Sequence, residues 1–230
     1  SVSVISLERL VEFGEFRASL TATISSLDDE KLSAQVLQGK QLFYDARDTR
    51  LSRDAYMSCA TCHNDGFHDG RVWDLTGQGE GLRGTINLRG RAGAQGLLHW
   101  SGNFDEVQDF EGQIRSLAGG TGLMSNAAFN TGTRAQPLGD RKTGVSDDLD
   151  ALAAYVQSLN RVSESPWRSA DGSLSPDAAS GRQLFASYGC VNCHNGALLT
   201  DDHFHNTGVA VSPNVSAPDS GRIAGARQAL

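Results

Sequence analysis

The chain has 230 residues, a formal net charge of −7 and a sequence pI of about 5.3. This acidic balance argues against nucleic acid as a partner, because binding to phosphates needs a basic surface. No apolar run approaches the roughly 20 residues that a membrane helix needs, so we expect no membrane span in this chain.

Residues 1–27 begin with a short alternation of polar and apolar side chains between Ser1 and Ile5. Such an alternation predicts a β-strand. We therefore expect residues 1–27 to form either an N-terminal arm or the end of a preceding domain.

The first predicted helix leads into a short cysteine motif. It is expected to open near Ser26, with Asp29 as a capping partner, and to carry apolar side chains on one face between residues 32 and 43. The motif that follows, at residues 59–63, reads Cys-Ala-Thr-Cys-His.

A glycine-rich stretch comes next and is expected to be mostly loop. It runs from residue 64 to residue 144 and contains 17 of the 26 glycines. A helix is predicted within it at residues 103–117, with Gly119 and Gly120 ending the helix. A further helix is predicted at residues 146–159, where an apolar stripe follows two aspartates suited to a helix N-terminus.

The second half of the chain repeats the first. Residues 162–174 read as a linker, and Ser175 followed by Pro176 predicts a capped helix start. Inside that helix, Gly-Arg-Gln-Leu-Phe at residues 181–185 repeats Gly-Lys-Gln-Leu-Phe at residues 39–43. Each repeat precedes a Cys-x-x-Cys-His motif, the second of which lies at residues 190–194.

These two motifs use every cysteine in the chain. Two thiols three positions apart can each add to one vinyl group of a porphyrin, and the next residue, histidine, then offers a nitrogen to the iron. A zinc ribbon would bring the two pairs closer in sequence, and a thioredoxin-type dithiol does not require the trailing histidine. The sequence therefore predicts two covalently bound haem c groups, attached through Cys59, Cys62, Cys190 and Cys193, with His63 and His194 as proximal iron ligands.

The predicted fold is mainly α, with two cytochrome c-like haem domains in tandem and long Gly-rich loops. The first domain is expected at residues 28–161 and the second at residues 175–230. No second closing helix is predicted after Thr200, so the second domain looks incomplete. We expect that the chain is a fragment or that another polypeptide completes this domain.

Thioether attachment of haem c takes place outside the bacterial cytoplasm, so a precursor should carry an export signal. No such signal is visible at Ser1. Either it has been removed or the chain is a piece of something longer. The expected location is the periplasm or another exported bacterial compartment.

Several stretches, in this order along the chain, resemble the bacterial di-haem cytochrome c peroxidase and MauG family. The resemblance implies one haem, usually the first, with an open iron where peroxide reacts, and a second haem that relays electrons from a redox protein partner. The family takes the distal ligand of its second haem from sequence well beyond the motif, where this chain stops. The matching stretches are residues 51–54, 58–63, 69–71, 99–102, 189–194 and 204–209.

The N-terminal strand carries a second resemblance. With its surroundings, it is similar to the final β-propeller strand of exported proteins that fuse a propeller to such a haem module.

Two residues are candidates for controlling the first haem. Met124 lies ahead of the predicted closing helix, where small cytochromes c keep a distal methionine, and it is either an iron ligand or a core residue. Trp100 matches a family aromatic that lies between the haems and passes electrons. Its alternative is an ordinary buried indole.

Peroxide cleavage also needs an acid-base group over an open iron. Glu111 is the first candidate, and the alternative is an ion pair with Arg115 on a solvated surface. The remaining histidines, apart from His99 beside Trp100, are expected to be surface or structural residues. Calcium is a weaker possibility at an acidic loop, which lacks the terminal glutamate of an EF-hand; its residues are Asn64, Asp65, Asp69 and Asp74.

Two functions follow from this sequence. In the first, the protein reduces peroxide, or uses it to oxidise a partner, at an open haem iron. In the second, both irons are six-coordinate and the protein only carries electrons. Met124 distinguishes the two, because its binding to the first iron would close the reactive site.

Overall fold

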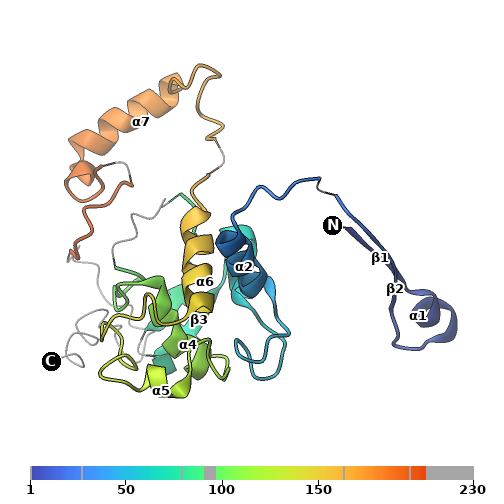
Figure 1. Cartoon of the computed structure of the whole chain (residues 1–230). Coiled ribbons are helices and arrows are strands. Elements are labelled where there is room, and N and C mark those ends of the chain that lie inside the picture. The colour runs from blue at the N-terminus through green and yellow to red at the C-terminus, as the bar shows by residue number, and fades with distance from the viewer. Residues whose placement is uncertain are drawn as a thin grey trace. The chain divides into compact units, whose positions relative to one another are not determined.

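The computed structural model describes residues 2–26, 28–78, 80–90, 97–162, 164–196 and 198–205. Within them the chain is helix-rich, with seven α-helices and two small antiparallel sheets (Figure 1). No helix among these residues is long and apolar enough to cross a membrane. The chain divides into two compact units, residues 1–34 and 35–230.

The first unit is a β-hairpin with a short helix at its turn. Strand β1 (Val2–Ser6) pairs antiparallel with β2 (Ser19–Ile24), and helix α1 (Glu8–Phe13) lies between them in sequence. The predicted strand at the start is therefore confirmed. Its relation to a propeller stays a prediction.

Helix α2 (Ala34–Tyr44) opens the second unit, and its predicted start near Ser26 was wrong. The residues before it satisfy their polar groups locally instead of entering a helix. The Glu30 carboxylate accepts a hydrogen bond from the backbone N–H of Leu32 at 2.9 Å, and Lys31 pairs with Asp29 at 3.1 Å. Such side-chain bonds compete with helix formation.

Helix α6 (Asp147–Ser158) confirms the helix predicted at residues 146–159. The Ser146 hydroxyl caps it by accepting from the N–H of Leu149 at 3.4 Å. Helices α2 and α6 lie side by side (Figure 1) and meet at Gly39, where an added Cβ would overlap the carbonyl oxygen of Ala151. A glycine at this point allows the two backbones to approach closely.

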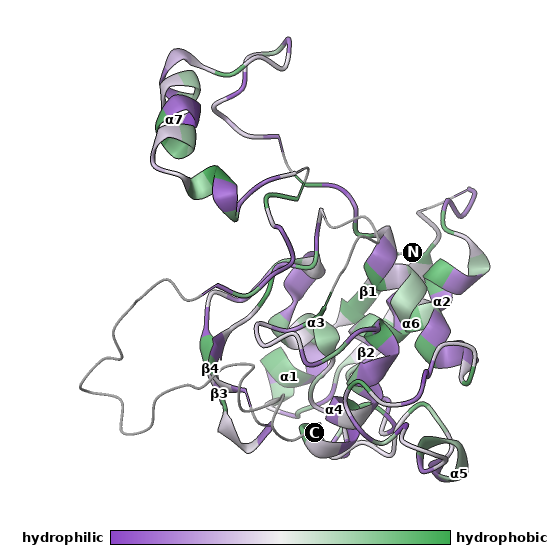
Figure 2. Ribbon diagram, turned by 90° about the vertical axis from the view of Figure 1, so that its left-hand side faces the viewer, coloured by the Kyte–Doolittle hydropathy of each residue, from purple (hydrophilic) through white to green (hydrophobic). Residues whose placement is uncertain are grey.

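A hydrophobic core forms around this crossing. Purple and green segments alternate along α2 and α6 in Figure 2, because each helix turns apolar side chains inward and polar side chains outward. The half-buried Cys59 and Ala60 of the first motif pack against this core. Its buried members are Leu42, Phe43, Leu51, Leu123, Met124, Leu149, Leu152 and Tyr155.

The helix predicted at residues 103–117 is shorter than expected. A 3-10 turn at Val107–Asp109 precedes α4 (Phe110–Ser116). The helix begins at Phe110 and not at residue 103, because the Asp109 carboxylate accepts hydrogen bonds from the backbone N–H groups of Asp105 and Glu106. These bonds hold that segment outside the helix. Its buried face is also more polar than predicted, since Gln108, Asp109 and Glu111 are buried while Leu117 is exposed.

The glycine-rich stretch contains a hairpin that the sequence did not predict. Strand β3 (Val72–Leu75) pairs with β4 (Gly81–Gly84), with a 3-10 turn at Thr76–Gln78 between them. Helix α5 (Asn126–Phe129) is a single turn.

Helix α7 (Pro176–Ser187) confirms the capped start at Ser175, whose hydroxyl accepts from the N–H of Ala178 at 3.3 Å. A 3-10 turn at Cys190–Asn192 follows it. The expectation that no closing helix follows, and the family stretch after His205, fall on residues 206–230 and lie outside the described residues.

Candidate haem-binding sites

The first motif forms helix α3 (Cys59–Cys62), a single turn that brings its two cysteines together. Ser58 and Thr61 stabilise its start, because the Thr61 hydroxyl accepts from the N–H of Ser58 at 3.0 Å and the N–H of Thr61 donates to the Ser58 carbonyl at 3.0 Å. The N–H of His63 donates to the Cys59 carbonyl at 2.9 Å, so the histidine continues the turn. Burial raises the pKa of the Cys59 thiol to about 11.

The His63 ring is oriented as an iron ligand requires. Its Nδ1 donates to the backbone carbonyl of Ile86 at 2.9 Å, which leaves Nε2 as the nitrogen with a lone pair. Burial lowers the pKa of His63, so the imidazole is held in the neutral form that binds metals. This geometry fits a haem iron.

The second motif repeats the arrangement in a more open setting. Nδ1 of His194 donates to the carbonyl of Leu199 at 3.0 Å, so here too Nε2 remains for a ligand. The Phe185 ring lies 6.2 Å from the His194 ring. His194 itself is exposed, and this geometry also fits a haem iron.

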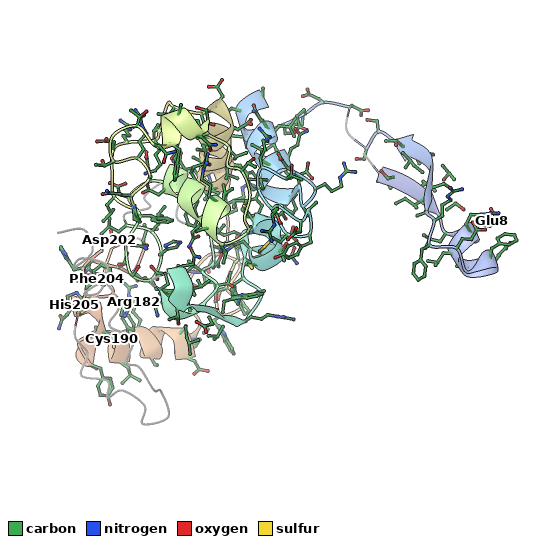
Figure 3. All side chains as sticks on the ribbon, turned by 90° about the horizontal axis from the view of Figure 1, so that it is seen from below. Glu8, Arg182, Cys190, Asp202, Phe204 and His205 are labelled. Carbon is green, nitrogen blue, oxygen red and sulfur yellow. The ribbon has the colours of Figure 1, made fainter. Side chains whose placement is uncertain are left out.

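Within the described part of the chain, one group of His, Cys, Asp and Glu side chains lies close enough to share a metal ion: Cys193, Asp201 and His205. Nε2 of His205 lies 2.7 Å from the Asp201 carboxylate. Figure 3 labels His205 and Cys190 in this part of the molecule. Because Cys193 is a predicted thioether cysteine, we assign the group to the surroundings of the second motif.

Met124 is buried in the core described above, with 4% of its surface exposed. Its backbone is held on both sides, since its N–H donates to Glu111 at 3.1 Å and its carbonyl accepts from Arg115 at 2.6 Å. The core position agrees with either of its two sequence interpretations.

Glu111 is the side chain that organises this segment. One carboxylate oxygen pairs with Arg115 at 2.8 Å, and the other accepts from the N–H of Leu123 at 2.9 Å. The predicted i to i+4 pair with Arg115 therefore forms, but Glu111 is fully buried and does not lie on a solvated surface. A Cβ at Gly122 would overlap the side chains of Glu111 and Arg115, so the loop can approach this ion pair only with glycine at position 122.

Trp100 is 58% exposed, so its interpretation as an ordinary buried indole was wrong. Its Nε1–H donates to the carbonyl of Gly84 at 2.7 Å. Together with Leu82 and Arg83 of β4, it lines a shallow depression in the surface.

The acidic loop uses its carboxylates within the protein. Asp69 accepts from the Trp73 indole at 2.9 Å and from the Thr85 hydroxyl at 2.8 Å, and Asp65 accepts from the Tyr44 hydroxyl at 3.0 Å. Among the described residues, these side chains do not join a group that could hold a metal ion. His68 is exposed, as expected, and His203 is exposed as well.

The structure adds a polar cluster that the sequence did not predict. Nδ1 of His99 lies 2.6 Å from Oδ1 of Asn103, and Glu80, which is buried, lies 3.8 Å from the same nitrogen. The rings of Phe104 and Phe110 enclose the imidazole. The spacing of His99 and Asn103 was a weak signal in the sequence, whereas the approach of Glu80 had none.

Comparison with known proteins agrees with this geometry. The family described as di-haem cytochrome c peroxidase matches residues 33–162, which is more than half of the chain. The chain belongs to the di-haem cytochrome c peroxidase family. Membership implies covalently bound haem c and a redox role, and it confirms the resemblance inferred from the motifs.

Three relatives show similar sequence identity to this chain, between 29% and 30%. Cytochrome-c peroxidase IdrP1 of Denitromonas iodatirespirans is 29% identical over 213 residues, covering 82% of this chain and 54% of the relative. Hydrazine synthase subunit gamma of Kuenenia stuttgartiensis is 30% identical, covering 70% and 45%. Methylamine utilization protein MauG of Methylorubrum extorquens is 29% identical, covering 76% and 53%. The chain thus spans about half the length of these relatives.

Proposed function

We propose that the chain is a di-haem c-type cytochrome with haem attached at Cys59 and Cys62 and at Cys190 and Cys193. The observation that carries this proposal is the shared orientation of the two motif histidines, whose Nδ1 atoms both donate to backbone carbonyls. That bond fixes the tautomer and leaves Nε2 for iron. The two motifs would belong to haem domains at residues 28–161 and 175–230, joined by the linker at 162–174.

The activity that we propose is reduction of peroxide, or its use to oxidise a partner, at the first haem. Bound haem iron would supply the coordination site and the electrons for O–O cleavage. His63 would hold this iron from the proximal side, and Trp100, exposed and anchored on Gly84, would pass electrons between the haems. Membership of a peroxidase family supports this choice. A redox protein would deliver the electrons one at a time.

A specific observation favours a second function. Met124 is buried in the same core against which Cys59 and Ala60 pack, so a methionine lies in the region of the first motif. If its sulfur binds the first iron, both irons are six-coordinate and the protein only carries electrons.

Spectroscopy on the haem-loaded protein separates the two functions. The enzyme requires a high-spin ferric signal and a rapid spectral change with hydrogen peroxide. The electron carrier requires a near-infrared methionine-to-iron band, no high-spin signal and no change with peroxide. Met124→Leu should remove that band only in the second case, and the other methionine provides the matched control, Met57→Leu, which should leave the spectrum unchanged in both.

The chemistry also suggests where the protein works. Because haem c is attached outside the bacterial cytoplasm, we propose a periplasmic or otherwise exported location. The partner is expected to be a redox protein, and the acidic surface, with a net charge of −7, suits a basic one.

A further inference from the structure

His99 and Asn103 form a pair whose geometry suits proton transfer. Nδ1 of His99 lies 2.6 Å from Oδ1 of Asn103. An amide oxygen only accepts, so Nδ1 carries the hydrogen, and Nε2 of the neutral ring has the lone pair. The ring lies 4.3 Å from Phe104 and 4.9 Å from Phe110 between centroids, and 14% of its side chain is exposed. The imidazole is thus a fixed base in an aromatic enclosure.

The backbone of His99 is held in a conformation that few side chains adopt. Its φ of +62° lies in the left-handed region, which is uncommon for residues other than glycine. Strain of this kind persists only where the surrounding structure enforces it, and it concentrates at functional sites. With this backbone conformation, the ring of His99 bonds to the side chain of Asn103.

Charged groups face this ring from several elements. A Glu80 oxygen lies 3.8 Å from Nδ1, and Glu80 itself pairs with Arg83 at 3.2 Å. Burial lowers the pKa of His99, whereas hydrogen bonds to the side chains of Asn103 and Gln113 and the charges of Glu80 and Asp109 act in the opposite direction. The net effect leaves the ring neutral near pH 7, as a general base must be.

The same segment of chain ties this pair to the first motif. The carbonyl of Ile86 accepts from His63, and two residues earlier the carbonyl of Gly84 accepts from Trp100, the neighbour of His99. The two imidazoles are also close enough that a charge on His99 lowers the pKa of His63. His99 therefore lies in the surroundings of the first candidate iron ligand.

We infer that His99, positioned by Asn103, is the proton-transfer residue of the peroxide site at the first haem; this inference rests on the proposed function. Glu111 is less suited, because both of its oxygens accept bonds from Arg115 and from the 123–124 backbone. Asn103 is a positioning residue, since it acts through His99.

With haem bound, Nε2 of His99 would take a proton from one oxygen of hydrogen peroxide and give it to the other oxygen, which would leave as water as the O–O bond breaks. The remaining oxygen would become a second water by taking up two electrons and two protons. The protons come from solvent, and a redox protein restores the two electrons one at a time. The sum is hydrogen peroxide, two electrons and two protons to two waters.

Hydrogen cyanide provides a probe that is independent of turnover, because it must also lose a proton as it binds ferric iron. We would measure the rates of cyanide binding and of the first spectral change with peroxide in three haem-loaded variants. His99→Asn keeps a residue that tolerates a positive φ but removes the base, so both rates should fall ~100-fold or more. The exposed His68 gives the control, His68→Gln, which should match the wild type.

Asn103→Asp tests the positioning role without removing the base. A carboxylate beside Nδ1 would raise the pKa of His99, so the pH profile of cyanide binding should shift to higher pH. A purely structural Asn103 would leave that profile in place. If His99→Asn does not fold or loses its haem, the pH profile of Asn103→Asp still tests the role of His99: a shift to higher pH supports it, and an unchanged profile contradicts it.

The outcomes separate this inference from the proposed function. If the wild type reacts with neither peroxide nor cyanide, the proposed function fails. If the wild type reacts and His99→Asn reacts equally fast, only the role of His99 fails. A low-spin wild type that becomes high-spin in His99→Asn would also overturn the inference, because His99 would then be an iron ligand.

Discussion

The two motifs share a sequence pattern but differ in what surrounds them. In the first repeat, Leu42 is 7% exposed and Phe43 is 1% exposed. Their counterparts in the second repeat are Leu184, which is 55% exposed, and Phe185, which is half-buried. The repeated pentapeptide, with Lys40 replaced by Arg182, is therefore a core element in the first region and largely uncovered, among the described residues, in the second.

The difference in burial comes from the helix that packs against the repeat and not from the repeat itself. Helix α2 packs against α6, which supplies Ala151 and Tyr155 at the crossing. Around α7, the structure describes no equivalent helix. Most of the stability of a protein helix comes from packing of its apolar face, so α7 has the pattern of a packed helix without, in the described residues, its partner. The repeated pattern is therefore packed against a partner helix in the first region, and against no described helix in the second.

The largest expected effect concerns the buried charge in the first region. Glu111→Gln would place an amide N–H₂ against the donors of Arg115 or the 123–124 backbone, and would leave Arg115 poorly compensated. We expect a loss of ~3 kcal/mol in the free energy of unfolding, because breaking a buried ion pair is strongly destabilising. Chemical denaturation of the haem-loaded protein would measure it.

A matched control lies in the second region. Asp177 is exposed in the first turn of α7, and Asp177→Asn should cost at most ~1 kcal/mol, the usual range for a charge at a helix N-terminus. Equal losses in the two variants would contradict the distinction between a buried clamp and an uncovered helix.

A second pair of variants tests the helix crossing directly. Gly39→Ala places a Cβ on the Ala151 carbonyl, so we expect a loss of ~1–3 kcal/mol from overpacking. At Gly181, an added Cβ meets no described atom within 4 Å, and Gly181→Ala should stabilise α7 by up to ~1 kcal/mol through helix propensity. Thermal unfolding of both variants provides the measurement. A destabilising Gly181→Ala would show that residues outside the described range pack on α7 as α6 packs on α2.

The smallest effect concerns pH and the buried His99. Burial lowers its pKa in the folded protein below the ordinary value of 6.5, so the unfolded chain binds more protons as the pH falls through that range. The contribution of His99 to stability is complete above pH 6.5 and is lost below it. His99→Asn should flatten the decline in unfolding free energy on acidification by about 1 kcal/mol per pH unit.

The exposed His68 again gives the comparison for this measurement. His68→Gln should retain the wild-type slope, because the groups that act on His99 (Asn103, Gln113, Glu80 and Asp109) are unchanged. A His99→Asn variant with the same slope as the wild type would show that His99 does not titrate on unfolding.

Much of the secondary structure was predictable where local signals were strong. Ser175 caps α7 as predicted, and α6 begins next to Ser146, where that helix was predicted to start, because an N-cap bond is made within one turn. The start of α2 was not predictable from Ser26, since the side chains of Asp29 and Glu30 bond locally and stop the helix from extending backwards. The hairpin of β3 and β4 was hidden by glycines, which give little periodicity.

The candidate site also has features that were predictable from the sequence and features that were not. The two cysteine motifs and their histidines were readable because the chemistry of attachment acts over five consecutive residues. The environment of Glu111 was not: its pairing with Arg115 is local, but its burial depends on Leu123 and Met124, which come from a separate loop. The exposure of Trp100 and the approach of Glu80 to His99 likewise depend on segments that are distant in sequence.

The sequence by itself determined the family, the candidate haem attachment points and the repeated helix before each motif, because each of these depends on covalent chemistry or on spacing within a few residues. Only the tertiary structure decided that Glu111 anchors the loop at Met124, that Glu80 approaches His99, and that Gly39 meets another helix whereas an added Cβ at Gly181 meets no described atom within 4 Å. These are contacts between segments up to about a hundred residues apart, and their free energies depend on burial and distance, which no local pattern specifies.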